Sequence, residues 1–309
     1  MIINTGMRTD IPAFYSRWLM NRIKAGYVMA RSPYDSGLVF RYSLSPSIAD
    51  LLAFCTKNPL PMLPLLGSLS QYKQFWFVTL TPYGREIEPG LPDKKEILKG
   101  IKELSRRYGK NCVEGRYDPV FLSEKYNEEF HIEAFGEIAA ELEGYAGACV
   151  ISFIDLYEKV KRNFPEAREV PMAARLRLGK FFAETAAKHN MALKPCAEGN
   201  YLAKYGADCS GCMTIRTFEK AIGEKLSVPK KSGGRPGACA CHLSADIGAY
   251  DTCGHLCRYC YANSDPSKVA ENMKKHDSDS PMLIGNVRPG DRILDAEQHS
   301  WRTGQHSLF

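Results

Sequence analysis

The sequence predicts an α/β fold: a TIM-like βα barrel, partial or closed, of about six to eight units, followed by a cysteine-rich segment. Three observations predict it. Short apolar runs alternate with helical patterns over the first 200 residues, as in parallel strands joined by crossover helices. Polar side chains follow each apolar run. Eight of the eleven cysteines lie between Cys196 and Cys260.

Six apolar runs are expected to form the strands of the barrel. They are Ile2–Thr5, Leu51–Thr56, Phe75–Thr81, Asn111–Tyr117, Cys149–Ile154 and Ala192–Cys196. Between them, residues 94–108 (KKEILKGIKELSRRY) and 128–145 (EEFHIEAFGEIAAELEGY) carry apolar residues at helical spacing. We therefore expect the barrel over residues 1–200, a cluster-binding segment completing the barrel mouth over 201–263, and a polar tail over 264–309.

The composition is that of a globular protein, with 44% hydrophobic and 25% charged residues and a formal charge of +6. No apolar run reaches the roughly 20 residues that span a bilayer. The N-terminus lacks a basic start followed by an apolar stretch, so it is not a signal peptide. We therefore expect a cytoplasmic protein without membrane partners, in a compartment where thiols stay reduced.

The residues that follow the predicted strands are candidates for catalysis. The carboxyl ends of barrel strands share one face, and active sites form there. The candidates are Arg8, Asp10, Lys57, Asn58, Thr81, Arg116, Asp118, Asp155 and Glu198. The alternative is that some of them are helix caps or turn residues, as for Asp118 before Pro119.

Cys253, Cys257 and Cys260 have the spacing C-x3-C-x2-C. A compact loop with this spacing can direct three thiolates at one [4Fe–4S] cluster, which leaves one iron open for chemistry. Zinc is the alternative, with His255 as a fourth ligand. Structural zinc usually takes two pairs of ligands, however, and a tight loop of three cysteines fits that arrangement poorly.

This loop resembles the signature of radical S-adenosylmethionine (SAM) enzymes, with Tyr259 as the aromatic residue before the last cysteine. The resemblance implies a [4Fe–4S] cluster that cleaves SAM after reduction, with an electron donor such as a flavodoxin or ferredoxin. Tyr259, Tyr261, Asn263 and Asp246 are the candidates for cofactor binding. The superfamily carries this loop after its first strand, so the order here implies a circular permutation with residues 244–252 (SADIGAYDT) as that strand.

Two further resemblances bear on function. The stretch CRYCY (257–261) resembles the spore photoproduct lyase branch, which repairs DNA. From residue 8 to 263 the chain is similar to an uncharacterised family, domain of unknown function 1848. RTDIPAFYSRW, TKNPLPML, RYDPVFL and HLCRYCYAN are among the matching stretches. That family implies no activity.

Five more cysteines suggest a second site. A closed [4Fe–4S] cluster would take Cys196, Cys239, Cys241 and one of Cys209 or Cys212. Zinc and free or redox-active thiols remain alternatives, because CxxC is a frequent zinc half-site. The scattered Cys55, Cys112 and Cys149 are expected in the core.

The chain ends in GQHSLF, and Gln305–Phe309 resembles the peptide that binds the bacterial sliding clamp, with His306 in place of the usual Leu. The alternative is a solvated tail. The sequence thus predicts a radical SAM enzyme of unknown substrate, with a nucleic-acid base as one candidate. A non-catalytic Fe–S electron-transfer or redox protein and a zinc-binding protein are the alternatives.

Overall fold

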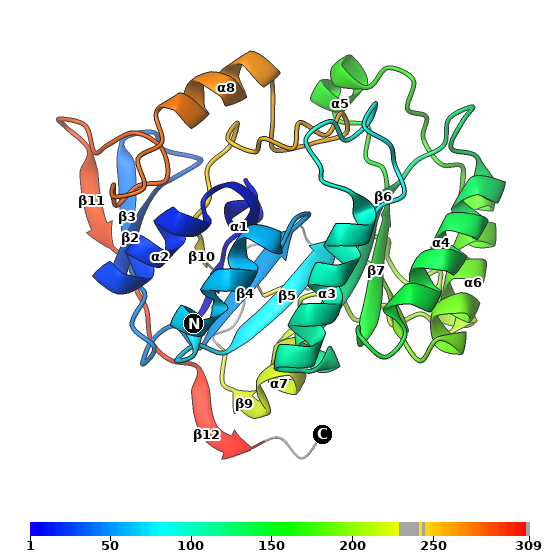
Figure 1. Ribbon diagram of the computed structural model, residues 1–309, viewed down its shortest axis with the longest axis horizontal. Helices are drawn as coiled ribbons and strands as arrows, with labels where there is room; N and C mark the ends of the chain where they lie inside the picture. The colour runs from blue at the N-terminus through cyan, green and yellow to red at the C-terminus, as the bar shows by residue number, and fades with distance from the viewer. Residues whose placement is uncertain (229–240, 243–244, 307–309) are drawn as a thin grey trace.

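A parallel seven-stranded β-sheet forms the centre of the computed structural model, in the order β10-β1-β4-β5-β6-β7-β8 (Figure 1). The structure describes residues 1–228, 241–242 and 245–306. The strands of this sheet are β1 (Ile2–Asn4), β4 (Leu51–Thr56), β5 (Gln74–Thr79), β6 (Val113–Val120), β7 (Ala148–Phe153), β8 (Ala192–Pro195) and β10 (Ala245–Asp246). The predicted α/β fold with parallel strands is confirmed, and each of the six expected runs forms a strand.

These runs form strands because both faces of the sheet are covered, which favours continuous apolar sequence over alternation. Every residue of β5 except Thr79 is buried. Phe54 of β4 and Trp76 of β5 are register partners, and their rings stack with centroids 4.1 Å apart. Such contacts fix the order of the strands and thereby the edge at which their carboxyl ends meet.

Helices cover the sheet and connect its strands. They are α1 (Ile11–Phe14), α2 (Ser16–Ala25), α3 (Lys94–Tyr108), α4 (Glu128–Leu142), α5 (Glu158–Asn163), α6 (Met172–Lys188), α7 (Ile215–Ile222) and α8 (Pro266–Lys274), with 3₁₀ turns η1 (Leu60–Leu69), η2 (Lys110–Cys112) and η3 (Ala203–Tyr205). Helices α3, α4 and α6 pack against β5, β6 and β7 (Figure 1). None of the described helices is long and apolar enough to cross a membrane.

Within the described residues, β8 and β10 are the two ends of the sheet and do not pair with each other. Irregular chain occupies the space beyond β8. The amide of Asp208 donates to the Leu193 carbonyl over 2.8 Å, and the amide of His242 donates to the Met213 carbonyl over 2.9 Å. The segment that leads into β10 therefore contacts the segment that lies beside β8.

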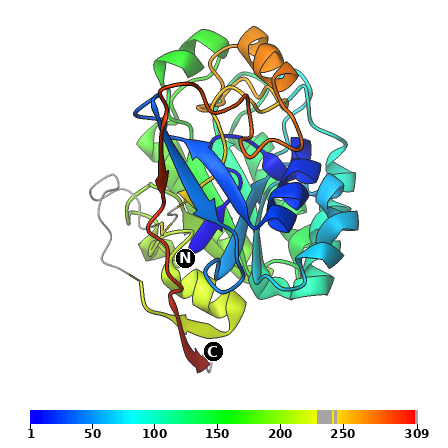
Figure 2. The ribbon, with the colours of Figure 1, turned by 90° about the vertical axis from the view of Figure 1, so that its left-hand side faces the viewer.

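Two small sheets lie outside the expected elements. The first contains β2 (Tyr27–Arg31), β3 (Leu38–Ser43) and β11 (Arg292–Asp295), and the second pairs β9 (Glu224–Leu226) with β12 (Arg302–His306). The described part of the expected polar tail thus packs along the molecule as α8, β11 and β12 (Figure 2). Trp301 is buried, and its amide donates to the Asp50 carboxylate over 2.7 Å.

Candidate functional site

The cysteine loop, residues 251–263, follows β10 and lies at the carboxyl-end edge of the sheet. Strand β10 pairs in parallel with β1, with Ala245 opposite Ile3. Asp251 and Leu256 have φ values of 55° and 54°, in the left-handed region, so the backbone of the loop turns sharply. The amide of Asp251 donates to the Ala262 carbonyl over 3.1 Å, which closes the loop.

Burial raises the pKa values of all three thiols of this loop. It raises the pKa of Cys257 to about 12, and it also raises the pKa of Cys253 and Cys260. The positive charge of Lys57 opposes this effect at Cys257, where it favours the thiolate. Three thiols in one loop, with a lysine beside Cys257, are the type of ligand that a soft metal or an Fe–S cluster binds.

The segment between β5 and α3 supports the cysteine loop. The amide of Gly90 donates to the His255 carbonyl and the amide of Arg258 donates to the Ile87 carbonyl, both over 3.0 Å. A Cβ atom at Gly90 would lie 2.3 Å from the carbonyl oxygen of Gly254. Only glycine allows this close approach of the two backbones.

Glu88, in that same segment, accepts hydrogen bonds from four side chains. Its carboxylate binds Thr81 Oγ1 at 2.7 Å, Lys57 Nζ at 2.9 Å, the Tyr259 hydroxyl and Lys94 Nζ. Burial alone raises the pKa of Glu88, but the charges of Lys57 and Lys94 outweigh burial and lower it to about 2. Glu88 is therefore an ionised group beneath the loop, and its contact fixes the Tyr259 ring.

Asp10 connects three elements of the site. Its Oδ1 accepts from the Ala13 amide at 3.1 Å and from Thr56 Oγ1 at 2.7 Å. Its Oδ2 accepts from the Lys57 amide at 2.7 Å and lies 2.9 Å from His255 Nε2. The other ring nitrogen of His255 lies 3.3 Å from the Gly90 carbonyl. Both nitrogens of His255, considered above as a zinc ligand, thus face protein oxygens.

The candidates for cofactor binding surround the loop. Asp246 receives Arg8 Nε at 2.6 Å, and its carbonyl receives Arg8 Nη2 at 2.7 Å. The hydroxyl of the half-exposed Tyr261 donates to the Met7 carbonyl. Asn263 Nδ2 donates to the Cys253 carbonyl over 2.8 Å. These contacts hold the loop after β1 against the cysteine loop.

Three buried polar atoms at this edge have no hydrogen-bond partner among the described residues: Asn4 Nδ2, Thr9 Oγ1 and Asn263 Oδ1. Asn4 ends β1, Thr9 lies in the loop that follows it, and Asn263 ends the cysteine loop. A buried polar group without a partner is costly, and it often indicates an absent ligand, ion or water. The residues present therefore suit a polar cofactor beside the cysteine loop.

Arg116 and Asp118, both in β6, lie in a second group of side chains. Arg116 Nε pairs with the Asp118 carboxylate, which also accepts from Ser152 Oγ. Arg116 Nη2 lies 3.8 Å from the sulfur of Cys196, directly after β8. The Cys212 sulfur is 3.6 Å from that of Cys196 and 3.1 Å from that of Cys241.

Of the remaining cysteine candidates, Cys209 has its pKa raised by burial and by Asp208, while the backbone of Leu202 and Ala203 opposes this. Cys239 lies outside the described residues. Among the described residues, no three or more His, Cys, Asp or Glu side chains are arranged to hold one metal ion.

Three further predicted candidates, Asn58, Asp155 and Glu198, have the following contacts. Asn58 Oδ1 accepts from the Leu60 amide at 3.1 Å, which starts η1. Asp155 receives the hydroxyl of Tyr157 at 3.1 Å. Glu198 pairs with Arg175 at 3.0 Å and also accepts from Tyr201 and the Phe153 amide. Asn58 thus acts as a turn residue, and Glu198 ties the end of β7 to α6.

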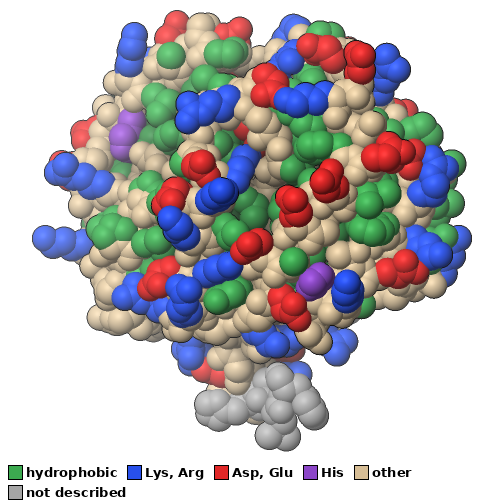
Figure 3. Space-filling view, turned by 45° about the vertical axis from the view of Figure 1, so that its right-hand side comes forward, with side chains coloured by type: hydrophobic (Ala, Val, Ile, Leu, Met, Phe, Trp, Pro, Cys, Tyr) green, Lys and Arg blue, Asp and Glu red, His purple; other side chains and the backbone are tan. Residues whose placement is uncertain are grey.

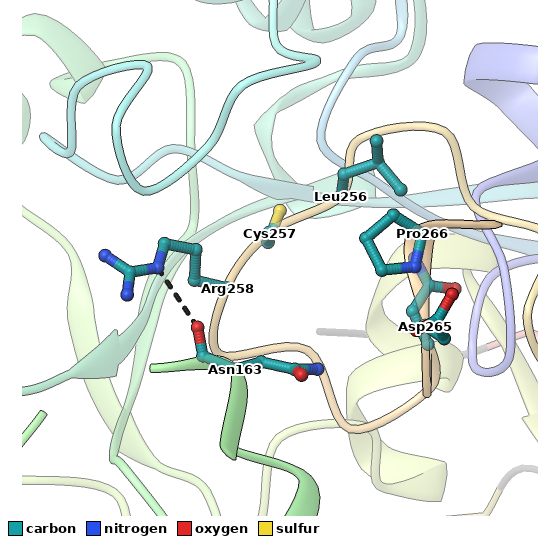
Figure 4. Close-up of a pocket in the computed structure, with 7 residues that line it drawn as sticks. Asn163, Leu256, Cys257, Arg258, Asp265 and Pro266 are labelled. Atoms are coloured by element: carbon teal, nitrogen blue, oxygen red, sulfur yellow. Dashed lines mark hydrogen bonds between the residues drawn. The ribbon is translucent and has the colours of Figure 1, made fainter. Parts of the chain in front are cut away.

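A cavity of about 170 Å³ opens beside Cys257 (Figure 4). It lies between the cysteine loop, the end of α5 and the start of α8, and its lining comprises Asn163, Leu256, Cys257, Arg258, Asn263, Asp265 and Pro266. Arg258 Nε donates to the Asn163 carbonyl across it over 3.1 Å. One thiol of the motif therefore borders a space that is accessible from outside.

Sequence reasoning missed Glu88 and Lys94, although both contribute to the core of the site. Glu88 follows the polar stretch TLTPYG, but nothing in that stretch distinguishes it from the exposed Glu86. Lys and Arg side chains are interspersed with Asp and Glu on the face shown in Figure 3. Of the expected clamp-binding peptide, Gln305 lies exposed in β12, and residues 307–309 lie outside the described residues.

Comparisons with known proteins give a family but no activity. No curated protein matches the chain. Among solved structures, the crystal structure of the IolI protein with a bound zinc atom is similar with a TM-score of 0.30 and 13% identity, over 72% of this chain and 70% of that chain. The domain of unknown function family DUF1848 matches residues 2–262. The chain therefore belongs to the DUF1848 family.

Proposed function

We propose that this protein is a radical SAM-type enzyme, in which Cys253, Cys257 and Cys260 hold a [4Fe–4S] cluster with one open iron. The single observation that supports it best is the position of the cysteine loop. The loop follows β10, which is the last of the main sheet's strands in the chain but stands at one end of the sheet, beside β1.

That position matches a circularly permuted arrangement of the superfamily. If the chain began at β10, the seven strands would lie in the sheet in the order in which they follow one another. The cysteine loop would then come directly after the first strand, as the superfamily has it. The sheet would act as a partial barrel, with the polar residues at its carboxyl ends forming the substrate pocket.

The residues around the loop suit this role. When bound, such a cluster supplies an electron and an open coordination position to SAM. Lys57 supplies positive charge next to Cys257, which offsets the negative charge of the thiolates. The unpartnered atoms of Asn4, Thr9 and Asn263 are suited to bind the polar groups of SAM.

The site supports an enzyme better than a simple electron carrier. Arg8, Asp10 and Lys57 occupy loops at the same edge of the sheet, and Arg116 lies in β6 opposite Thr79, the last residue of β5. A protein that only transfers electrons needs one exposed cluster and has little use for these groups. A substrate pocket needs such groups to orient a ligand.

The experiment is anaerobic reconstitution of the full chain with iron and sulfide, followed by dithionite and SAM. We expect a brown protein that converts SAM to 5′-deoxyadenosine and methionine, measured by mass spectrometry. Cys257→Ser should abolish this conversion, whereas Cys149→Ser, which changes a buried core thiol in β7, should retain it. A reconstituted cluster that neither binds nor cleaves SAM would contradict the proposal.

A further inference from the structure

Three thiols that are distant in the sequence meet outside the cysteine loop. Cys196 follows β8, Cys212 precedes α7, and Cys241 lies on the approach to β10. Their sulfurs form a chain, with 3.6 Å from Cys196 to Cys212 and 3.1 Å from Cys212 to Cys241. Neither pair is joined by a disulfide.

These separations are close to those imposed by a shared metal. Two thiolates on one tetrahedral zinc, with Zn–S bonds of about 2.3 Å, lie about 3.8 Å apart. The pair of Cys196 and Cys212 is already within a few tenths of an ångström of that value. Among the described residues no three His, Cys, Asp or Glu side chains are arranged to hold one metal ion, so the shorter contact to Cys241 has to widen when an ion enters.

The fold holds the middle thiol in place. Thr217 Oγ1 donates to the Cys212 carbonyl over 3.1 Å. That hydroxyl also lies 3.1 Å from the ammonium group of Lys194, which pairs with Glu114. The backbone of Cys212 is thus fixed by a buried network that starts from β6 and β8, so the sulfur has a defined position.

Charge also favours a metal here. Three thiolates around a divalent ion, or around a [4Fe–4S]²⁺ cluster, carry a net charge of −1 in either case. A buried negative charge needs a compensating cation. The guanidinium of Arg116 lies 3.8 Å from the Cys196 sulfur and contributes positive charge there, which it shares with the Asp118 carboxylate.

We propose that Cys196, Cys212 and Cys241 form a second metal centre with thiolate ligands, separate from the cysteine loop. Its ligand chemistry selects a soft partner, either zinc or the iron of a second Fe–S cluster. Each cysteine loses its proton to solvent when it binds. The centre joins the segment beside β8 to the segment that enters β10, and so it acts where the main sheet has no strand pairing among the described residues. The proposal does not depend on the proposed radical SAM activity.

The test uses the full-length chain with Cys253, Cys257 and Cys260 all changed to Ser, so that only the second centre can hold metal. Protein purified without oxygen is analysed for zinc, iron and acid-labile sulfide. Bound zinc identifies a mononuclear centre, and iron with sulfide identifies a cluster. We expect one of these two results, and we expect Cys212→Ser in the same background to remove the metal. Cys112→Ser, which changes a buried thiol that donates to the Ala221 carbonyl, should retain it.

A second measurement on the unmodified chain covers the case in which the Ser variants do not fold. Thiol alkylation is mapped by mass spectrometry before and after a strong chelator. We expect the chelator to increase labelling of Cys196, Cys212 and Cys241 together, with no change at Cys209. The second centre would be overturned if the triple Ser variant contained neither zinc nor iron. It would also be overturned if the chelator did not change the labelling of the three thiols. The loop's own cluster would then remain a separate question.

Discussion

The Glu88 carboxylate accepts a hydrogen bond from the Tyr259 hydroxyl, which links the segment after β5 to the cysteine loop. Tyr259 stands directly before the last cysteine of the motif, and its ring lies under the ammonium of Lys57 at 5.3 Å. The aromatic residue of the motif is therefore held by an ionised carboxylate from another part of the sheet.

The first prediction concerns the charge of Glu88. Glu88→Gln leaves the ammonium groups of Lys57 and Lys94 without their buried partner. Breaking a buried ion pair in this way costs about 3–5 kcal/mol of stability. We expect that loss in the free energy of unfolding, measured by urea denaturation. Glu86→Gln removes an exposed ion pair and should change it by less than about 1 kcal/mol. Equal effects of the two variants would contradict this account.

The second prediction is a dependence on pH. The folded pKa of Glu88, about 2, lies below its ordinary value of 4.5. A depressed pKa contributes stability that is fully present above 4.5 and is lost as the pH falls through 2. We expect the unfolding free energy of the unmodified chain to decline across this window. The decline should be shallower in Glu88→Gln, and parallel curves would exclude Glu88 as the source.

The third prediction concerns the close approach at Gly90. In Gly90→Ala, the new Cβ would lie 2.3 Å from the Gly254 carbonyl oxygen and 2.8 Å from the Cα of His255. The cysteine loop has to shift, at a cost of about 1–3 kcal/mol. We expect lower stability and weaker retention of iron after reconstitution.

Gly67→Ala is the matched control, because its Cβ meets nothing within 4 Å. It should preserve both stability and iron content. If Gly90→Ala retained as much iron as this control, the packing of the two loops would not matter for the site.

The fourth prediction concerns the reactivity of the second thiol group in metal-free, reduced protein. The hydrogen bond from the Cys212 thiol, with help from Arg116, lowers the pKa of Cys196, whereas the hydrogen bonds of Cys212 with Cys196 and Cys241, together with burial, raise the pKa of Cys212. The thiolate is the nucleophile. At neutral pH we therefore expect iodoacetamide to label Cys196 before Cys212.

The variant Cys212→Ala tests the cause. It removes the donor, so labelling of Cys196 should slow, while labelling of Cys209 serves as an internal reference. Faster labelling of Cys196 in the variant would mean that access, and not its pKa, limits the reaction.

Six of the seven strands of the main sheet could be predicted from apolar runs, because burial on both faces leaves continuous apolar sequence such as LLAFCT in β4. The hairpin of β2 and β3 was missed, because most of its residues are only partly buried. Strand β11 has four exposed residues and pairs only because its partner β3 is already in place. The sequence of β11 alone therefore does not identify it as a strand.

The site was predictable only in part, for a related reason. Cysteine spacing identifies a candidate loop, because its residues are close in the chain. Glu88 acquires its role through Tyr259, which lies 171 residues away. Likewise, Cys209 and Cys212 are equivalent in the stretch DCSGC, and it is the fold that brings Cys212 against Cys196. Contacts of this kind depend on tertiary packing and leave no local pattern.

The pairing of Ala245 with Ile3 has a consequence for biosynthesis. In the nascent chain β1 has an open side until β10 and the cysteine loop have been synthesised. The cysteine loop can therefore dock only after all seven strands of the main sheet have been made. Until then the nascent chain exposes a bare sheet edge, which is a risk for aggregation.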